Sequence, residues 1–238
     1  MKDQQTHDYF DDFTPHYPPE RFNFAIEFLR ENAQPDASLI DIGCGDGANL
    51  HLIKTQTDLT RFTGMDISEK YLEKARNQVG CETVNGSILD DMFVEQHRGK
   101  FDYCTIGSVL HHLIGGTRAE STRLAIKCME NSMALLKPGG HMIIYEPTHG
   151  PQFLMTIVFW LKKIIGGIVR KRVEVGPNWI NFGQPVVSYY TVQQMEQFLN
   201  GLKNAKTVRN VVINKQKLGG VIDRISLGLV VEKLPAKG

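Results

Sequence analysis

The sequence predicts an α/β fold with a mostly parallel, doubly wound sheet. Short apolar segments alternate with helical segments along most of the 238 residues, a pattern typical of parallel βαβ units. A glycine-rich turn at residues 43–47 also joins the first apolar segment directly to a helix, as in ligand-binding α/β sheets. A chain of this length fits one large domain, with or without an inserted lid.

The first elements are an aromatic arm and a helix. Residues 1–20 contain three prolines among aromatic side chains that include Tyr9 and Tyr17. This segment is too aromatic for a disordered tail, which leaves an arm that folds over a site or one that packs on the surface. Residues 20–33 repeat apolar side chains at helical spacing, and Pro35 ends that helix before the first strand.

The first strand and its glycine turn are the strongest local signal. Residues 39–42 form a short apolar run that contains one carboxylate, Asp41. Three glycines then occupy alternate positions: Gly43, Gly45 and Gly47. Glycine permits the positive φ of a tight turn and lets a ligand approach backbone N–H groups at a helix N-terminus.

Two classes of ligand compete for this turn. The spacing Gly43-x-Gly45-x-x-Ala48, with Asp66 about 20 residues further on, satisfies the dinucleotide fingerprint. Asp41, however, lies two residues before the first glycine. A carboxylate in that position suits a cationic ligand better than a pyrophosphate.

The later segments continue the alternation. Ser68 is a good N-cap for the helix that follows the second strand, and Pro147 is expected to stop the fifth strand. A loop of about ten residues joins the last two strands, which predicts an antiparallel pair. The predicted strands are residues 62–66, 81–84, 101–106, 141–146, 208–213 and 225–232, and the predicted helices are 48–57, 68–75, 118–136 and 191–199.

Composition and charge limit the classes of function that the protein can have. The formal net charge is +1, with 42% hydrophobic and 22% charged residues, which is ordinary for a soluble globular protein and gives no global field for nucleic acid. No signal peptide is visible, and we expect a cytoplasmic protein with reduced thiols. The four cysteines are widely spaced, without a CxxC pair: Cys44, Cys81, Cys104 and Cys128.

Four ordered blocks resemble those of the class I S-adenosylmethionine-dependent methyltransferases, over about residues 38–148. The blocks are 39–50, with the pattern acid-x-Gly-x-Gly-x-Gly, 85–90 (NGSILD), 101–113 (FDYCTIGSVLHHL) and 136–147 (LKPGGHMIIYEP). The resemblance implies a Rossmann-like seven-stranded sheet in the order 3-2-1-4-5-7-6, with strand 7 antiparallel. It divides the chain into an N-terminal arm and helix (1–37), a cofactor-binding core (38–148), an inserted lid (149–190) and the C-terminal part of the core (191–238).

The resemblance also implies a set of cofactor contacts. Asp41, Gly43 and Gly45 would hold the methionine part of S-adenosylmethionine, and Gly107 would line the same side. Asp66 would bind the ribose, although the alternative is an acid that only caps the helix at Ser68. Ile67, Ser87 and Ile88 would meet the adenine. The family often has aspartate at the position of Ser87, so that contact is weaker or water-mediated here.

Histidines after the fourth strand are the candidates for catalysis. Methylation of a hydroxyl or a carbon acid needs a base, whereas an amine needs only a neutral lone pair. His112 is the first candidate for this base and His111 the second, although a histidine here can also simply pack the loop. Substrate contacts are expected from Tyr17, His149, Tyr189 and Tyr190, and no metal site is predicted.

The substrate is predicted to be small and lipophilic. The fourth strand ends in Gly107-Ser108-Val109-Leu110, not in the Asp/Asn-Pro-Pro-Tyr/Phe typical of enzymes that methylate nucleic-acid bases or amides. An apolar helix over 153–169 precedes basic residues at 170–172. It is interpreted first as a lid, and otherwise as a homodimer contact or a peripheral membrane contact through 153–172.

The sequence therefore favours S-adenosylmethionine-dependent O- or C-methylation of a small metabolite over N-methylation. One alternative is an NAD(P)-dependent oxidoreductase, but the chain lacks a Tyr-x-x-x-Lys-like pair. The other is a non-catalytic, cofactor-binding accessory subunit, which the complete set of cofactor residues disfavours.

Overall fold

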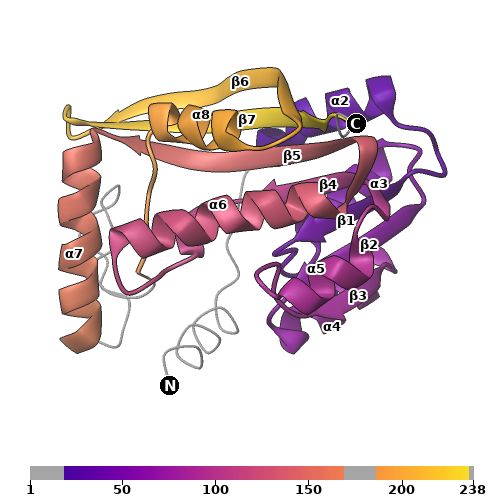
Figure 1. Ribbon diagram of the computed structural model, residues 1–238, viewed down its shortest axis with the longest axis horizontal. Helices are drawn as coiled ribbons and strands as arrows, with labels where there is room; N and C mark the ends of the chain where they lie inside the picture. Colours follow the sequence, from indigo (N-terminus) through magenta and orange to yellow (C-terminus); the bar gives the residue numbers. More distant parts are fainter. Residues whose placement is uncertain (1–18, 169–185, 236–238) are drawn as a thin grey trace.

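A single seven-stranded sheet forms the centre of the computed structural model, which describes residues 19–168 and 186–235 (Figure 1). Its order, β3-β2-β1-β4-β5-β7-β6, confirms the predicted order. β7 runs antiparallel to both of its neighbours, and the other pairs are parallel. The strands are β1 Ser38–Ile42, β2 Arg61–Asp66, β3 Glu82–Asn85, β4 Phe101–Gly107, β5 Leu136–Gly150, β6 Ala205–Leu218 and β7 Ile222–Lys233.

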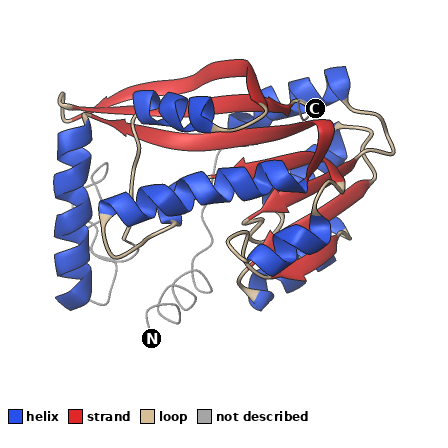
Figure 2. Ribbon diagram, viewed as in Figure 1, coloured by secondary structure: helices blue, strands red, loops and turns tan. Residues whose placement is uncertain are grey.

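Helices flank both faces of this sheet (Figure 2). They are η1 Pro19–Phe22, α2 Asn23–Asn32, α3 Ala48–Gln56, α4 Glu69–Val79, α5 Asp91–His97, η2 Leu110–His112, α6 Arg118–Leu135, α7 Gln152–Ile168 and α8 Val192–Gly201. The predicted cap is present, because the Ser68 hydroxyl accepts from the Tyr71 N–H at 3.3 Å. Thr117 and Thr191 begin α6 and α8 with complete capping boxes. The sequence analysis missed α5, which has only seven residues.

Neighbouring residues of the strands face two separate hydrophobic clusters. Leu39 of β1 packs with residues of α2, α3 and α4. Ile40, the next residue, packs with residues of α5, α6 and α8 on the opposite face. This alternation is the pleat of a strand that is buried on both sides, and it fixes the sheet between two helical layers.

β5 is longer than predicted, because Pro147 does not end it. β4 pairs with β5 only as far as the register Gly107↔Tyr145. Beyond Tyr145, β5 continues against β7 alone, with Pro147 opposite Ser226. A strand with a partner on one side only tolerates the missing N–H of proline. The prediction failed because the end of β4 turns this part of β5 into an edge.

The predicted loop of about ten residues between the last strands is also wrong. β6 extends to Leu218 and β7 begins at Ile222, around a turn in which Gly219 and Gly220 have φ of 57° and 73°. The polar run Asn214–Lys217 belongs to β6 and is exposed. An edge strand faces solvent, so this part of β6 lacks the apolar pattern by which strands were recognised.

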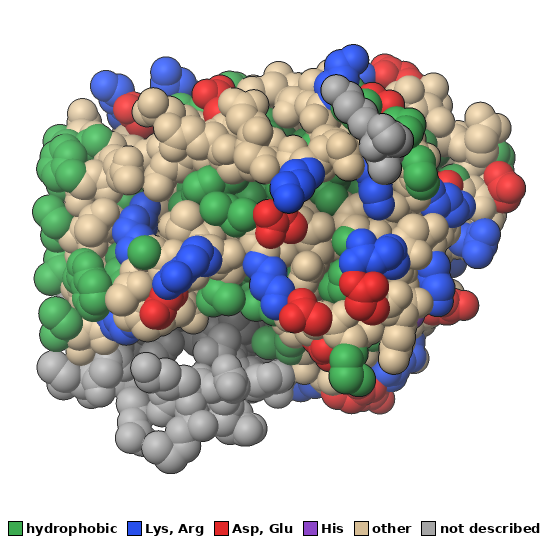
Figure 3. All heavy atoms as spheres, in the orientation of Figure 1, with side chains coloured by type: hydrophobic (Ala, Val, Ile, Leu, Met, Phe, Trp, Pro, Cys, Tyr) green, Lys and Arg blue, Asp and Glu red, His purple; other side chains and the backbone are tan. Residues whose placement is uncertain are grey.

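α7 runs along one end of the molecule, from the end of β5 (Figure 1). Met155, Phe159 and Lys162 are buried on its inner side. Five large apolar side chains are exposed, and Figure 3 shows hydrophobic side chains along this edge: Phe153, Ile157, Trp160, Leu161 and Ile164. Among the described residues, no helix combines the length and hydropathy needed to span a bilayer.

Candidate active site

The glycine turn after β1 has the backbone that its sequence predicts. Gly43, Gly45 and Gly47 have φ of 68°, 54° and 86°, the left-handed region in which only glycine is unstrained. A Cβ on Gly43 would lie 2.6 Å from a methyl group of Val109. The turn therefore lies directly against the segment that leads from β4 into η2.

Asp41 is the buried carboxylate of this turn. Its side chain is completely buried, and Oδ1 accepts a hydrogen bond from the Thr105 hydroxyl at 2.6 Å. Oδ2 has no hydrogen-bond partner among the described residues. Burial raises the pKa of Asp41 to about 7, while Thr105 and the positive charge of Arg21 oppose this rise. An oxygen in this state can accept a cationic N–H donor.

Arg21 is a candidate cofactor contact that the sequence analysis missed. It is 9% exposed in η1, and its Nη2 donates to the Asn49 side chain at 3.0 Å. Its guanidinium lies 5.2 Å from the ring centre of Tyr145. A Cβ on Gly107 would approach the same Asn49 amide to 2.9 Å. Asp41 and Arg21 thus bring opposite charges to one end of the turn.

The residues expected at the nucleoside end lie next to one another. Asp66 accepts backbone N–H bonds from Gly45 and Ser68, both at 2.9 Å. Its β2 backbone pairs with Asn85 of β3, and the Gly86 N–H bonds to the Asp66 carbonyl at 3.0 Å. Asp66 therefore helps to hold the start of α4 and also lies at the glycine turn.

The three other nucleoside candidates differ in exposure. Ile67 is 37% exposed and Ile88 only 4%. The Ser87 hydroxyl accepts from the Leu89 N–H at 3.2 Å, within the turn after β3. Ile67 thus offers an exposed apolar surface, whereas Ile88 belongs to a buried hydrophobic cluster.

A histidine and a glutamate form a buried pair near the glycine turn that follows β1. His111 Nδ1 lies 2.5 Å from Glu146 Oε1, and the two side chains are almost inaccessible. The register of β4 against β5, continued by a bond from the Ser108 N–H to the Tyr145 carbonyl at 2.8 Å, brings them together. Burial lowers the pKa of His111 to about 3 and raises the pKa of Glu146 well above its ordinary value.

This pair can serve as a proton acceptor. With the proton on Nδ1 and Glu146 accepting it, the Nε2 of His111 carries the free lone pair. The carboxylate would then stabilise the imidazolium that forms when Nε2 takes a proton, as in catalytic triads. Glu146 is the last residue of the strand predicted over 141–146, but the sequence analysis gave it no role.

Four aromatic rings form a continuous row through the pair. The ring centres are separated by 4.1 Å from His112 to His111, by 5.3 Å from His111 to Tyr189, and by 4.0 Å from Tyr189 to His149. Burial lowers the pKa of His112, and it lowers that of His149 to about 3. Lys162 of α7, which is 3% exposed, contributes a positive charge that lowers the pKa of His111 and His112 further.

The predicted substrate residues fall into three groups. Tyr189 lies beside His111 in the row of rings, and His149 lies beside Tyr189. Tyr190 is fully buried in the hydrophobic core, 5.2 Å from Phe198 between ring centres. Tyr17 lies outside the described residues. Both candidate histidines lie in η2, and His111 has a carboxylate partner in Glu146.

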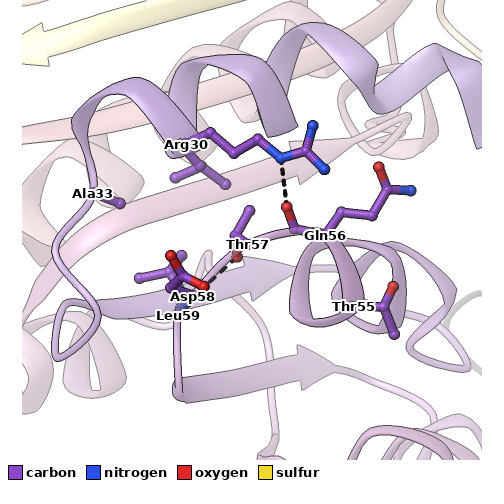
Figure 4. Close-up of a pocket in the computed structure, with 8 residues that line it drawn as sticks. Arg30, Ala33, Thr55, Gln56, Thr57, Asp58 and Leu59 are labelled. Atoms are coloured by element: carbon purple, nitrogen blue, oxygen red, sulfur yellow. Dashed lines mark hydrogen bonds between the residues drawn. The ribbon is translucent and has the colours of Figure 1, made fainter.

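A separate recess lies between the ends of α2 and α3 (Figure 4). Its lining includes Leu29, Thr57 and Leu59, and a bond from Arg30 Nε to the Gln56 carbonyl at 2.6 Å crosses it. The recess lies near the start of β2, whereas ligands of open α/β sheets bind at the carboxyl ends of the strands. We therefore assign the site to the glycine turn and the His111–Glu146 pair.

Within the described ranges, no three His, Cys, Asp or Glu side chains are grouped as metal ligands would be. The four cysteines are free thiols, of which Cys44, Cys104 and Cys128 are buried.

Comparison with known proteins gives a domain match and a fold match. A family model described as a methyltransferase domain matches residues 40–142. The structure resembles that of magnesium protoporphyrin IX methyltransferase from Synechocystis with bound SAH. The TM-score is 0.63 at 14% identity, over 98% of this chain and 100% of that one.

Two curated proteins are similar in sequence. A hybrid PKS-NRPS synthetase of Emericella nidulans is 28% identical over 179 residues, which are 69% of this chain but 4% of that protein. The trans-aconitate 2-methyltransferase of an Enterobacter species is 38% identical over 74 residues, or 30% of this chain and 29% of that protein. The chain thus spans only a small part of the length of these relatives.

Proposed function

We propose that this chain, which matches a methyltransferase family model over residues 40–142 and shares the fold of a methyltransferase with bound S-adenosylhomocysteine, transfers a methyl group from S-adenosylmethionine to a small, lipophilic molecule. The acceptor is a carbon or hydroxyl acid. The observation that carries this choice is the buried contact between His111 and Glu146, because an amine acceptor would not need a base.

The residues around the glycine turn fit the charged groups of the cofactor. Asp41 Oδ2, which has no partner in the described part of the chain, matches the ammonium of the methionine part. Arg21 matches its carboxylate, and Asp66 the ribose hydroxyls. When bound, S-adenosylmethionine supplies an electrophilic methyl group on a sulfonium.

His111 would remove the acceptor's proton with Nε2, while Glu146 holds Nδ1. Tyr189 and His149 continue the row of rings and would line the acceptor. The similarity to a hybrid PKS-NRPS synthetase supports a carbon acid. The relative named for trans-aconitate supports a rival acceptor, a carboxylate, which needs no base.

A panel of four acceptors tests this proposal. We would measure formation of S-adenosylhomocysteine with acetoacetyl-N-acetylcysteamine as a carbon acid, 4-phenylphenol, trans-aconitate and benzylamine. Turnover with the thioester or the phenol, and its loss in His111→Ala, is the expected result. Turnover only with trans-aconitate or benzylamine, unaffected by His111→Ala, would assign the protein to a base-independent reaction instead.

Asp66→Asn should weaken S-adenosylhomocysteine binding by about two orders of magnitude. The change removes a charged acceptor, and hydrogen bonds to charged groups contribute about 1.5–3 kcal/mol each. Calorimetric titration measures the affinity, with Glu69→Gln as the neighbouring control, because Glu69 pairs with exposed Arg76. Unchanged affinity in Asp66→Asn would leave Asp66 only the role of holding the start of α4.

A further inference from the structure

We propose that Thr105 of β4 is a positioning residue for the cofactor. Its hydroxyl holds the Asp41 carboxylate so that Oδ2 meets the ammonium of S-adenosylmethionine, and it keeps this carboxylate charged at neutral pH. The inference rests on the proposed contact between Asp41 and the cofactor, but not on the identity of the acceptor. It adds to the cofactor site a residue of the strand beside β1.

The first observation is the register of the strands on either side of Asp41. Asp41 is the direct partner of Thr105 in the parallel pair of β1 and β4, and partner side chains lie on the same face of a sheet. On the other side, the partner of Asp41 is Gly64 of β2. A Cβ on Gly64 would lie 2.8 Å from Cys44 Sγ and 3.3 Å from a methyl group of Leu50. Thr105 thus provides the polar side chain beside Asp41.

The second observation is the hydrogen bond between the two side chains. The Thr105 hydroxyl donates to Asp41 Oδ1 at 2.6 Å, and both side chains are completely buried. This distance is within the range of about 2.5–2.7 Å for a hydroxyl bound to a carboxylate, a bond roughly twice as strong as one between neutral groups. Asp41 Oδ2 has no hydrogen-bond partner in the described part of the chain. The bond therefore orients the carboxylate through one oxygen and leaves the other for a ligand.

The third observation is the apolar environment of this carboxylate. Leu39 lies two residues before Asp41, on the same face of β1, and it belongs to a buried hydrophobic cluster that also contains Ile143 of β5. A carboxylate in such surroundings takes up a proton unless hydrogen bonds or opposite charge stabilise its anion. Burial accordingly raises the pKa of Asp41 to about 7, and the hydrogen bond from Thr105 is the largest influence that opposes this rise.

The charged and titratable groups around Asp41 come from several elements. The positive charge of Arg21 in η1 lowers the pKa of Asp41, and the negative charge of Asp66 in β2 raises it. Burial raises the pKa of three thiols within electrostatic reach of Asp41, which therefore stay uncharged near neutral pH: Cys44, Cys81 and Cys104. Thr105 is the group that stabilises the anion by a direct hydrogen bond.

The protonation of Asp41 links this hydrogen bond to cofactor binding. The ammonium of the cofactor is attracted by the carboxylate but not by the neutral acid. A site that must first lose a proton binds its ligand more weakly as the pH falls. Because Thr105 lowers the pKa of Asp41, its hydroxyl should extend tight cofactor binding to lower pH.

The first test measures the pKa of Asp41 in the cofactor-free protein by NMR of carboxyl-labelled aspartate, with Asp41→Asn to identify the signal. Thr105→Val should raise this pKa from about 7 to about 8 or above, because a hydrogen bond to a charged group contributes about tenfold or more. Thr105→Ser should leave it near the wild-type value. Thr63→Val is the control, since Thr63 of β2 is the partner of Ile40 and not of Asp41. An unchanged pKa in Thr105→Val overturns the proposal.

The second test is calorimetric titration with S-adenosylhomocysteine at two pH values. A pKa higher by about one should weaken binding by about tenfold at pH 6 but only about twofold at pH 8. Thr105→Val should therefore show this pattern, and Thr105→Ser should bind like wild type. In the Asp41→Asn background, adding Thr105→Val should change the affinity by less than about twofold, because the carboxylate on which Thr105 acts is absent.

The variants separate failure of the cofactor contact from failure of the role of Thr105. Wild-type affinity in Asp41→Asn would refute the contact between Asp41 and the cofactor. Weak binding by Asp41→Asn, together with wild-type binding by Thr105→Val, would refute the role of Thr105 alone. An equal loss at both pH values, shared by Thr105→Ser and kept in the Asp41→Asn background, would assign Thr105 to packing. If wild type binds no S-adenosylhomocysteine, the cofactor site is refuted, and the proposal with it.

Discussion

Replacing His111 with alanine should lower turnover by about 10²- to 10⁴-fold, the usual contribution of a general base. The affinity for S-adenosylhomocysteine should stay within about twofold, because the residues assigned to the cofactor lie around the glycine turn. Glu146→Gln should produce a loss of similar size, since an amide can impose the wrong tautomer on Nδ1. Single-turnover kinetics with the best acceptor of the panel would measure both effects.

His112→Ala is the matched control for this prediction. His112 lies in the same short helix, and its ring centre is 4.1 Å from that of His111. If His111 is the base, His112→Ala should cost much less activity than His111→Ala. A larger loss in His112→Ala would instead support the order of candidates that the sequence alone suggested.

The pair also predicts a pH dependence. It works as a base when it holds one proton, between Nδ1 and Glu146, and it is inactive when both groups are protonated. Burial lowers the pKa of His111 and raises that of Glu146. As the pH falls, Glu146 therefore takes up a proton before the imidazole does, and its titration limits activity. Turnover in wild type should therefore fall as the pH is lowered, and the double variant His111→Ala, Glu146→Gln should lack this limb.

Asp41→Asn should weaken S-adenosylhomocysteine binding by about 10²-fold or more, because a buried cation would lose its counter-charge. The pKa of Asp41 is raised to about 7 by burial. A bound ammonium lowers that pKa, so binding below neutral pH must release a proton. Calorimetry in buffers of different ionisation enthalpy would detect this release in wild type and its absence in Asp41→Asn.

The same substitution should stabilise the cofactor-free protein above neutral pH. The pKa of Asp41 is higher in the folded state than its ordinary value of 3.8. The stability that the protonated carboxyl contributes is therefore complete below pH 3.8. This contribution is lost as the pH rises through about 7. Asparagine does not ionise, so the melting temperature of Asp41→Asn should exceed that of wild type by more at pH 8 than at pH 5.

The stability gain should be on the order of a few kcal/mol, as a shift of about three pKa units implies. Asp46→Asn is the control, because Asp46 lies in the same turn and its carboxylate accepts from the exposed Ala48 N–H at 3.2 Å. Equal affinity and equal melting temperature for Asp41→Asn and wild type would contradict both the raised pKa and the cofactor contact.

Much of the fold was predictable because its signals are local. The glycines of the first turn, the cap at Ser68 and the end of the long helix near Leu135 each depend on a few neighbouring residues. The order of the strands came from the family resemblance. β5 and β6 were predicted too short, since Pro147 and the polar run Asn214–Lys217 make sense only once their neighbouring strands are known.

The candidate site shows the same division. Asp41 and Asp66 follow from the spacing within one strand–helix–strand unit, in which they lie on the first and second strands. Glu146 depends on the register of β4 against β5, although its place at a strand end was a usable signal. Arg21 and Lys162 depend on how η1 and α7 pack, and the sequence offered only one hint, the two adjacent lysines on an otherwise apolar helix.

The two edge strands of the sheet have a consequence for solubility. An edge strand exposes unpaired backbone groups and can recruit a strand from another molecule. β3, at one edge, has only four residues. β6, at the other, is fourteen residues long, but it is bulged near Thr207 and Val212 and carries Lys206, Arg209 and Lys215. A short edge and a charged, irregular edge both resist strand addition, so this long antiparallel hairpin can remain open to solvent without becoming a template for fibrils.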